Sequence, residues 1–283
     1  MILYKYIYNH AIKVLEDLRL KVTPPNEFND PFELTPDLRF AITLESMLEE
    51  ARNEPENFRP NWEAMRSHPE WPDTFEKFIA GLPQGITTNF KEFKRRSKIR
   101  LKQEALKSIH EASEHLAILC LSKPNDSIPM WSYYAESHKG VAFGIYSLHS
   151  SFDNVPENFF NVVDYRRKRY PVYLPLKEQT KFGELLKVMC TKSRVWRHEK
   201  EYRRIYKLDK LIAQKVPDRN EPLYFVKIDQ NAIREVIFGA CVDPKLEKSI
   251  RDTIARNPTT LGHISLLRCK RHPTKFKLEI VPA

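Results

Sequence analysis

The sequence predicts an α+β fold, with a β-rich body and a helical insertion over about residues 41–115. Short runs rich in β-branched and aromatic residues occur on both sides of this segment. The segment itself has long charged stretches, few β-branched residues and helix-like spacing. Hydrophobic residues are 41% of the 283 residues, which is enough for one large core, so we expect a single domain over residues 1–283.

The N-terminal elements are expected to be a strand at residues 2–8, a helix at about 10–18 and a short strand at 20–23. The first strand is β-branched and aromatic, and the helix carries its apolar residues on one side. The segment 26–32 (NEFNDPF) contains Pro, Asn and Asp, which interrupt helices and central strands. We therefore expect turns there.

The insertion is expected to end with a long basic helix at about residues 90–115. Strands then return as two apolar runs, at 115–122 (HLAILCLS) and 141–146 (VAFGIY), which have the length of buried strands. The Asn-Asp-Ser sequence at 125–127 offers N-caps for a short helix between them.

The rest of the chain alternates between strands and helices. Helices are expected at residues 177–191 and 243–255. Strands are expected at 160–165, 201–208, 223–228, 233–238, 264–269 and 275–281.

The composition restricts the class of protein and its partners. There are 47 Lys and Arg against 37 Asp and Glu, a formal charge of +10, which favours nucleic acid, anionic membranes or phosphorylated cofactors. No apolar run approaches the roughly 18 residues of a membrane span. The N-terminus lacks the pattern of a signal peptide, so we expect a cytoplasmic protein without a membrane partner. Four cysteines without C-x-x-C spacing are expected to be reduced thiols.

Glycine is scarce, with only seven residues and no G-x-G pair. The P-loop and the dinucleotide fingerprint both need glycine-rich loops, and the G-x-S-x-G nucleophile elbow is missing too. A bound nucleotide is therefore expected to be held by other means.

A charged block at residues 192–203 is the first candidate site. If a strand begins near Glu199, then Glu199, Glu201 and Arg203 lie on one face, because side chains alternate along a strand. Two acids beside an arginine can orient a hydroxyl and activate a nucleophile. The alternative is an exposed strand with ion pairs. Residue 202 is Tyr, so the second histidine of an H-E-x-x-H site is missing and no metal site is expected.

Two further blocks carry polar and aromatic residues. In the segment 26–33 (NEFNDPFE), Asn29 or Asp30 either stiffens a corner or presents a hydrogen-bonding edge to a ligand. The segment 130–140 belongs either to the core or to a site that stacks on a planar ring and approaches a phosphate. Its candidate residues are Trp131, Tyr134, His138 and Lys139.

In their order along the chain, these blocks resemble the bacterial domain of unknown function 2971 family. The resemblance spans nearly the whole chain apart from the helical insertion. The matching blocks are Tyr-Lys-Tyr at 4–6, Asn-Asp-Pro-Phe at 29–32, Met-Trp-Ser-x-Tyr-Ala-x-x-His-x-Gly at 130–140, Trp-x-x-Glu-x-Glu-Tyr-Arg at 196–203 and Ile-x-x-Val-Ile-Phe-Gly at 233–239.

The block order is also similar to the layout of ADP-ribosyltransferases. This resemblance implies a strongly bent or split, mostly antiparallel sheet that holds NAD in a cleft without a glycine-rich loop. It implies that Glu201 or Glu199 bonds the ribose 2′-hydroxyl and favours the positive charge that develops as nicotinamide leaves. Tyr134 is the third candidate catalytic residue. The candidate NAD-binding residues are Tyr4, Lys5, Tyr6, Asn29, Ser122, Trp131, His138, Lys139 and Arg203.

We therefore expect an NAD-consuming ADP-ribosyltransferase-like enzyme, a toxin or phage-defence effector, that modifies RNA, DNA or a nucleic-acid-bound protein. An antitoxin or immunity protein is a further candidate partner. The expected basic docking residues are Arg95, Arg96, Arg166, Arg167, Lys168 and Arg169.

Two alternatives stay open. One is a non-catalytic nucleic-acid-binding module that uses the same basic residues. The other is a metal-dependent nuclease in which Asp30, Glu199 and Glu201 gather around Mg²⁺.

Overall fold

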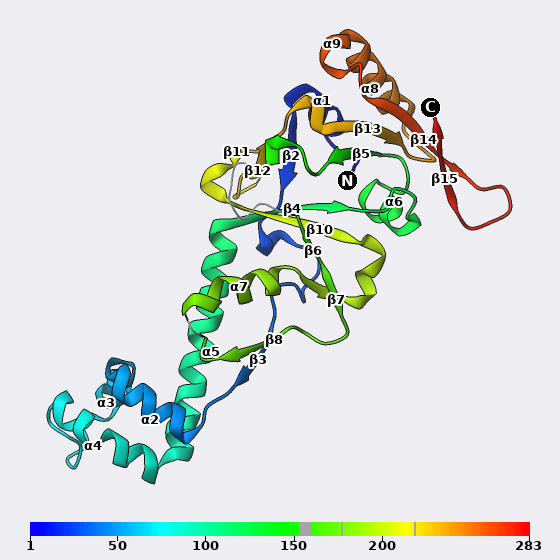
Figure 1. Ribbon diagram of the computed structural model, residues 1–283. Helices are drawn as coiled ribbons and strands as arrows, with labels where there is room; N and C mark the ends of the chain where they lie inside the picture. Colours follow the sequence, from blue (N-terminus) through cyan, green and yellow to red (C-terminus); the bar gives the residue numbers. More distant parts are fainter. Residues whose placement is uncertain (153–159, 177, 218) are drawn as a thin grey trace. The chain divides into compact units, whose positions relative to one another are not determined.

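The computed structural model describes residues 1–152, 160–176, 178–217 and 219–283, and it confirms the α+β class (Figure 1). The chain divides into two compact units. The first unit contains Met1–Thr35, Glu111–Arg169 and Leu186–Ala283. The second unit contains Pro36–His110 and Tyr170–Leu185. Among the described helices, none combines the length and apolar character that crossing a bilayer requires.

A large mixed sheet forms the body of the first unit. Its strand order is β15-β14-β13-β5-β1-β4-β10-β6. Only the β13–β14 pairing is parallel among the described strands of this sheet. The strands are β1 (Ile2–Ile7), β4 (Leu116–Ser122), β5 (Val141–Tyr146), β6 (Asn161–Val162), β10 (Glu201–Lys207), β13 (Ile233–Phe238), β14 (Ser265–Arg271) and β15 (Leu278–Pro282).

The pairing between β1 and β4 is unusually short. Strand β1 pairs with β5 along its whole length, and β4 pairs with β10 along its whole length. Between β1 and β4, in contrast, Tyr4 and Ser122 are the only registered pair in the described chain. Further along β4, Ile118 instead exchanges backbone hydrogen bonds with Thr23, at 3.0 and 2.9 Å. The ladder therefore opens between β1 and β4, and this opening is called the seam below.

The two faces of the sheet bury different sets of side chains, because neighbouring residues of a strand point to opposite faces. Leu3, Val141 and Phe143 pack in one core cluster with residues of α1 (Ala11–Asp17) and α8 (Pro244–Arg256). Tyr4, Tyr6 and Ala142 pack in the other with α6 (Ile128–Tyr134). Alternation along β1 thus turns two tyrosines towards the helix that carries the Met-Trp-Ser block.

Smaller sheets and short helices complete the first unit. A three-stranded sheet has the order β11-β12-β2, and β7 pairs in parallel with β9. The strands are β2 (Arg19–Val22), β7 (Asp164–Arg166), β9 (Thr191–Ser193), β11 (Ile212–Gln214) and β12 (Leu223–Lys227). The short helices are η1 (Pro25–Glu27), η3 (Ser150–Phe152), η4 (Arg194–Glu199), η5 (Leu208–Lys210), η6 (Gln230–Ala232) and α9 (Pro258–Leu261).

The second unit is mainly helical. Its core contains Met47, Phe58, Phe78 and Ile86, all buried. Thr43 caps the N-terminus of the helix Leu44–Asn53 with a capping box, since its hydroxyl accepts from the Ser46 amide at 3.0 Å. Strand β3 pairs in parallel with β8. The elements are β3 (Asp37–Phe40), α2 (Leu44–Asn53), η2 (Pro55–Phe58), α3 (Arg59–Met65), α4 (Phe75–Thr88), α5 (Phe90–His115), β8 (Pro171–Leu174) and α7 (Glu178–Met189); the last residues of α5 and of α7 belong to the first unit.

Several element boundaries differ from the expectation. The single strand expected at 160–165 is two strands, β6 and β7, because the chain leaves β10 after Val162 and pairs next with β9. The helix expected at 177–191 ends at Met189, and residue 177, where it was expected to begin, lies outside the described residues. The strands β3, β8, β9 and β11 were not expected, since each has only three or four residues.

Replacing Gly239 by Ala should destabilise the first unit. A Cβ at this position would overlap the carbonyl oxygen of His138, and the backbone would have to shift. Overpacking of this kind costs about 1–3 kcal/mol. Gly183→Ala in α7 is the matched control, because its Cβ meets nothing within 4 Å. Urea unfolding should show a loss for Gly239→Ala and a small gain for Gly183→Ala. Equal effects of the two substitutions would contradict the packing described for Gly239.

Candidate functional site

A pocket of about 350 Å³ lies at the seam, and all of its lining residues belong to the first unit. Strand β1 contributes Tyr4, Lys5 and Tyr6, and the facing β4 contributes Cys120, Leu121 and Ser122. Further lining comes from the turn after β2, from α6 and from a group of buried charged residues. Because the β1–β4 ladder is open, side chains of both strands line the space between them, where backbone hydrogen bonds would otherwise join the strands.

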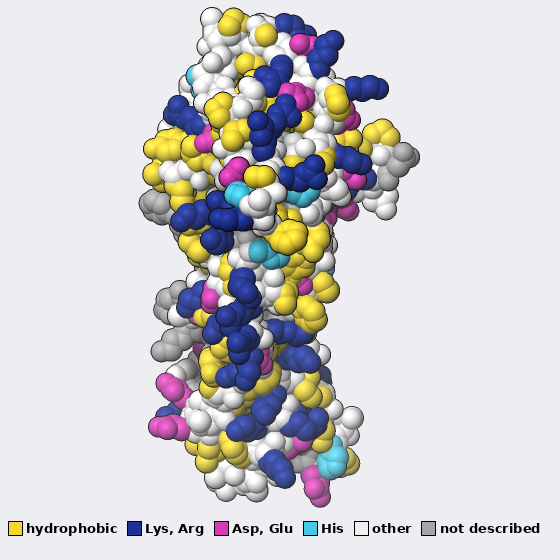
Figure 2. Space-filling view, turned by 90° about the vertical axis from the view of Figure 1, so that its right-hand side faces the viewer, with side chains coloured by type: hydrophobic (Ala, Val, Ile, Leu, Met, Phe, Trp, Pro, Cys, Tyr) yellow, Lys and Arg dark blue, Asp and Glu magenta, His cyan; other side chains and the backbone are white. Residues whose placement is uncertain are grey.

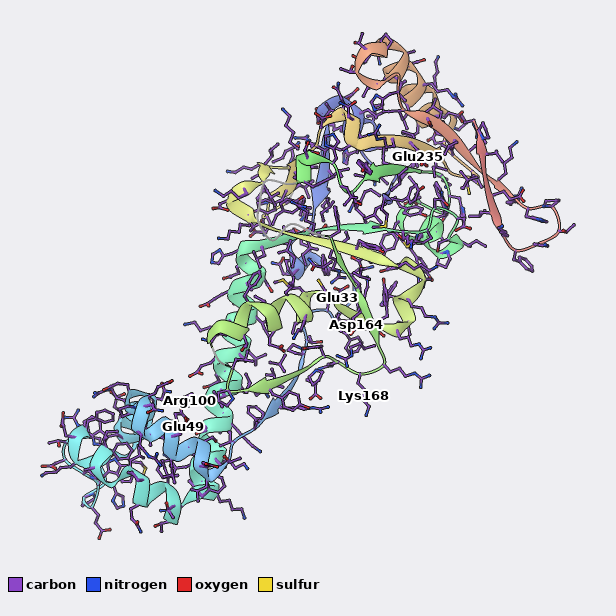
Figure 3. The ribbon with its side chains drawn as sticks, in the orientation of Figure 1. Glu33, Glu49, Arg100, Asp164, Lys168 and Glu235 are labelled. Atoms are coloured by element: carbon purple, nitrogen blue, oxygen red, sulfur yellow. The ribbon has the colours of Figure 1, made fainter. Side chains whose placement is uncertain are left out.

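Five charged residues gather at this pocket, and we call them the ion cluster: Glu33, Lys192, Glu199, Glu201 and Arg203. Each is at most 9% exposed. The Lys192 ammonium lies among the three carboxylates. Its Nζ is 2.7 Å from Glu199 Oε2, 3.3 Å from Glu33 Oε1 and 3.4 Å from Glu201 Oε2. Figure 3 labels Glu33, which enters the cluster from the N-terminal part of the chain.

Arg203 is the second cation of the ion cluster, and it binds Glu201 with two parallel hydrogen bonds. Its Nε lies 2.9 Å from Glu201 Oε1 and its Nη2 lies 3.0 Å from Oε2. Its Nη1 is 2.6 Å from Glu33 Oε2, and the guanidinium lies 5.1 Å from the centroid of the Phe28 ring. This two-point geometry fixes the Glu201 carboxylate strongly.

The local backbone explains how the two acids of the block converge. Glu201 and Arg203 alternate along β10 and share a face, as expected. The strand expected at 201–208 begins at Glu201, but Glu199 lies outside it, because Glu199 ends η4 and Lys200 has a left-handed φ of 42°. The Ser122 hydroxyl donates to the Glu199 carbonyl oxygen, which fixes this turn against β4. Glu199 therefore reaches the ion cluster through a tight reversal, not through strand alternation.

The electrostatics distinguish the two acids. Three carboxylates face two cations in the ion cluster, so one negative charge is not balanced within it. Burial would raise the pKa of Glu201, but Arg203 and Lys192 outweigh it and lower this pKa to about 2. Burial raises the pKa of Glu199, and the Glu201 carboxylate adds to this, although Lys192 opposes it. Glu199 is therefore the acid of the pair that takes up a proton more readily.

Polar residues outside the ion cluster hold both acids in place. The Tyr134 hydroxyl donates to Glu199 Oε1 at 2.7 Å, and burial followed by the Glu199 charge raises the pKa of this tyrosine. Asn29 hydrogen-bonds the same hydroxyl group. The Glu201 amide donates to the Tyr165 hydroxyl at 2.8 Å.

Lys5 adds a cation from β1, on the other side of the seam. Its Nζ donates to the Cys120 carbonyl oxygen at 3.1 Å, and burial lowers its pKa. Lys5 is thus held at the pocket while remaining outside the ion cluster.

The pocket brings together nine of the twelve predicted catalytic and NAD-binding residues, namely Tyr4, Lys5, Tyr6, Asn29, Ser122, Tyr134, Glu199, Glu201 and Arg203. Trp131, His138 and Lys139 are not among its lining residues. Trp131 is completely buried, donates from Nε1 to the Asn125 carbonyl oxygen at 2.8 Å and lies against His138. The packing of Trp131 and His138 therefore agrees with the alternative that this segment belongs to the core.

The predicted basic residues fall in both units. Arg166, Arg167, Lys168 and Arg169 follow or end β7 in the first unit, and Figure 3 labels Lys168 there. Lys and Arg side chains are spread widely over the face drawn in Figure 2, with hydrophobic and acidic ones among them.

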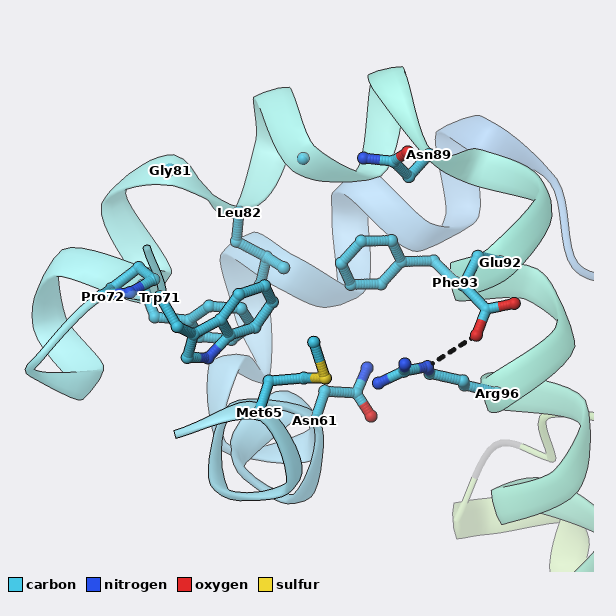
Figure 4. A pocket seen from close by; sticks show the side chains of 12 residues that line it. Asn61, Met65, Trp71, Pro72, Gly81, Leu82, Asn89, Glu92, Phe93 and Arg96 are labelled. Atoms are coloured by element: carbon cyan, nitrogen blue, oxygen red, sulfur yellow. Dashed lines mark hydrogen bonds and ion pairs between the residues drawn. The ribbon is translucent and has the colours of Figure 1, made fainter. Parts of the chain in front are cut away.

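Arg95 and Arg96 lie on α5 in the second unit and share the carboxylate of Glu92, at 2.8 and 2.9 Å. Arg96 also lines a second pocket, of about 280 Å³, whose other walls are mostly apolar (Figure 4). Its guanidinium extends across this pocket towards Asn61 in Figure 4. Arg96 is therefore placed differently from an arginine on an open docking surface.

The arrangement required by the magnesium-nuclease alternative is not found. Among the described residues, no group of three or more His, Cys, Asp or Glu side chains is placed to hold a metal ion. Asp30 does not line the pocket, and its Oδ1 accepts from the Phe32 amide at 2.9 Å in a tight turn. The Lys192 ammonium also occupies the position among the carboxylates that a divalent cation would need.

Sequence reasoning missed Glu33, Lys192, Tyr165 and Cys120 as site residues. Glu33 is the last residue of the block 26–33, and Lys192 is the first residue of the block 192–203. Both blocks contribute to the pocket, but no role was predicted for these two residues. The useful signal was Lys192 two residues after the apolar run Val188–Cys190, where a buried lysine requires carboxylate partners. Cys120 is engaged differently, since its thiol hydrogen-bonds the Glu201 side chain.

No family model, curated protein or solved structure matches this chain.

Stability is expected to fall in acid through Glu201. Its folded-state pKa of about 2 lies below the ordinary value of 4.5, so its contribution is complete above about pH 4.5 and is lost as pH falls towards 2. The contribution is on the order of 3 kcal/mol. Urea unfolding between pH 7 and 3 should show a loss in the wild type that is smaller in Glu201→Gln.

Glu92→Gln is the matched control for this experiment. The Glu92 carboxylate has the same lowered pKa of about 2, through Arg95 and Arg96, but it is exposed to solvent. Its removal should change the pH dependence little, because exposed ion pairs contribute little. An identical pH dependence for wild type and Glu201→Gln would show that burial of the Glu201–Arg203 pair does not have this effect.

Proposed function

We propose that this protein is an ADP-ribosyltransferase-like enzyme that binds NAD in the pocket at the seam and transfers ADP-ribose to nucleic acid or to a nucleic-acid-bound protein. The observation that carries the proposal is the Glu199 carboxylate, buried beside the pocket and held by Tyr134 and Lys192. In a cell, such an enzyme acts as a toxin or phage-defence effector, and an antitoxin or immunity protein would restrain it.

The seam supports this proposal because it offers a cleft without a glycine-rich loop. A sheet that opens between two strands is what the resemblance to ADP-ribosyltransferases implies. Tyr4, Phe28 and Tyr134 provide aromatic surface for a nicotinamide ring. Lys5 and Lys21 also line the pocket and provide cations for the pyrophosphate.

The contacts of the two acids favour different roles for them. Both Glu201 oxygens are bound by Arg203, and its lowered pKa keeps this group ionised. We therefore assign Glu201 as a positioning residue that fixes Arg203 and Lys192. Glu199 has the raised pKa and bonds Tyr134, a second pocket residue, so we assign Glu199 as the acid that meets the substrate.

The proposed reaction breaks the bond between C1′ of the ribose and the nicotinamide nitrogen. The bonding electron pair leaves with nicotinamide, and positive charge develops on the ribosyl carbon. The Glu199 carboxylate stabilises this charge through its hydrogen bond to the 2′-hydroxyl. A nucleophilic oxygen or nitrogen of the acceptor then bonds to C1′, and its proton passes to the Glu199 carboxylate, whose raised pKa suits proton transfer.

Glu199→Gln is expected to reduce nicotinamide release and the transfer of label from NAD by about 100-fold or more, because the variant loses both the charge and the base. Its unfolding transition should stay close to that of the wild type, since the Gln side chain keeps the shape and can still accept from Tyr134. The measurement uses labelled NAD with cellular RNA, DNA and protein as acceptors.

Glu247→Gln is the control for this loss. Glu247 is an acid of the first unit that binds Arg251 and Arg268 outside the pocket, so its removal should leave turnover unchanged. The proposal fails if the wild type neither releases nicotinamide nor transfers label, or if Glu199→Gln is as active as the wild type. Cleavage of the RNA or DNA acceptor that EDTA abolishes would favour the metal-dependent nuclease instead.

A further inference from the structure

Three aromatic side chains form a cluster on the surface of the first unit. Tyr133 comes from α6, and Trp196 and His198 come from η4. The ring centroids of Tyr133 and Trp196 are 6.4 Å apart, those of Tyr133 and His198 are 6.3 Å apart, and those of Trp196 and His198 are 6.1 Å apart. Tyr133 is 67% exposed, which is unusual for an aromatic residue that only packs two elements together. We call these three rings the ring platform.

Basic residues reach the neighbourhood of the ring platform through the parallel pairing of β7 and β9. Arg166 pairs with Ser193 at the ends of the two strands. Since the strands are parallel, the segments that follow them leave in the same direction, side by side. The first segment contains the exposed Arg167, Lys168 and Arg169, and the second contains the exposed Arg194 and Arg197. Two basic runs that are far apart in sequence thus begin at neighbouring positions.

The ring platform also adjoins the pocket, through two pairs of consecutive residues. Tyr133 is exposed, while the next residue, Tyr134, lines the pocket and bonds Glu199. His198 belongs to the ring platform, and the next residue is Glu199 itself. Lys192 connects the two regions, because its Nζ lies 5.2 Å from the Trp196 ring centroid and 2.7 Å from Glu199.

We propose that the ring platform and its basic neighbours bind single-stranded nucleic acid, with an unpaired base stacked on the exposed Tyr133 ring and its edge against Trp196, since the planes of these two rings are 70° apart. Arg167, Lys168, Arg194 and Arg197 contact the phosphates. Exposed rings beside arginines are suited to single strands, because every base has a face that stacks, whereas the bases of a duplex are covered by their neighbours. This inference rests on the proposed function in one respect: it names an unpaired nucleotide as the acceptor that is brought next to Glu199.

The binding experiment measures the anisotropy of a labelled oligonucleotide of about 15 nucleotides, a length that covers one such site. The single strand is compared with the same strand in a duplex, and separate arms use DNA and RNA. The wild type is expected to bind the single strand at least about ten-fold more tightly than the duplex. Affinity should fall with salt, by a slope of about 0.7 for each phosphate contact.

Variants then separate stacking from charge. Tyr133→Ala and Trp196→Leu should each weaken single-strand binding about ten-fold with little change in the salt slope. Phe276→Ala is the matched control, because Phe276 is an exposed aromatic residue on the connection between β14 and β15. It should bind as the wild type does.

For the charges, Arg194→Gln with Arg197→Gln should reduce the salt slope by about 1.4, for two lost phosphate contacts. Lys245→Gln with Lys248→Gln removes two exposed cations from α8 and should change neither affinity nor slope.

The inference is overturned if the single strand and the duplex bind equally, if neither binds at low salt, or if Tyr133→Ala and Trp196→Leu both keep wild-type affinity. Glu247→Gln should bind the single strand as the wild type does, because Glu247 pairs with Arg251 and Arg268 outside both the pocket and the ring platform. Binding of the single strand by a protein that never consumes NAD would refute the proposed function and support the ring platform. NAD consumption together with wild-type single-strand binding in both Tyr133→Ala and Trp196→Leu would support the proposed function and refute the ring platform.

Discussion

The arrangement of the pocket depends on the ion pairs of the Lys192 ammonium with three carboxylates. The ammonium joins the carboxylate of Glu33, from the turn before β3, to those of Glu199 and Glu201, which lie on either side of Lys200 in a distant part of the sequence. Burying three carboxylates without a cation would be very unfavourable, so Lys192 and Arg203 are a condition for this part of the fold and not an addition to it. The turn that holds Glu33, the reversal at Lys200 and the first residues of β10 are all fixed by the same few charges.

The same cluster explains why two acids two residues apart differ chemically. Glu201 receives a two-point bond from Arg203 and is ionised throughout the usual pH range, whereas the Glu199 carboxylate has no arginine partner among the described residues and is held there by Lys192 and Tyr134 alone. Charge balance, and not burial, separates them, since both side chains are almost completely buried. A site assembled in this way holds one acid whose pKa is lowered and one whose pKa is raised.

The sequence allowed the apolar strands and the polar blocks to be predicted, but not how the blocks would meet. Runs such as HLAILCLS indicate a buried strand without any tertiary information, because hydrophobic periodicity is a local property. The approach of Glu199 depends on one left-handed residue, Lys200, which no local pattern indicates. Trp131 and His138 resemble ligand-binding residues in sequence, yet they pack against each other, since a short helix does not reveal that Trp131 faces the core and His138 lies beyond the end of α6. The meeting of Arg166 with Ser193 required a parallel pairing of two three-residue strands, which are too short for a sequence signal.

The single residue pair between β1 and β4 also has a consequence for how the first unit responds to a ligand. One half of the large sheet runs from β15 to β1 and the other from β4 to β6, and the main chain holds these halves together across the seam almost only at Tyr4 and Ser122. A molecule bound at the seam would contact both halves. Its contacts would replace the backbone hydrogen bonds that β1 and β4 do not make with each other. Ligand binding would then slow amide hydrogen exchange on β1 and β4 together and sharpen the unfolding transition. Neither half of the sheet would need to change its shape.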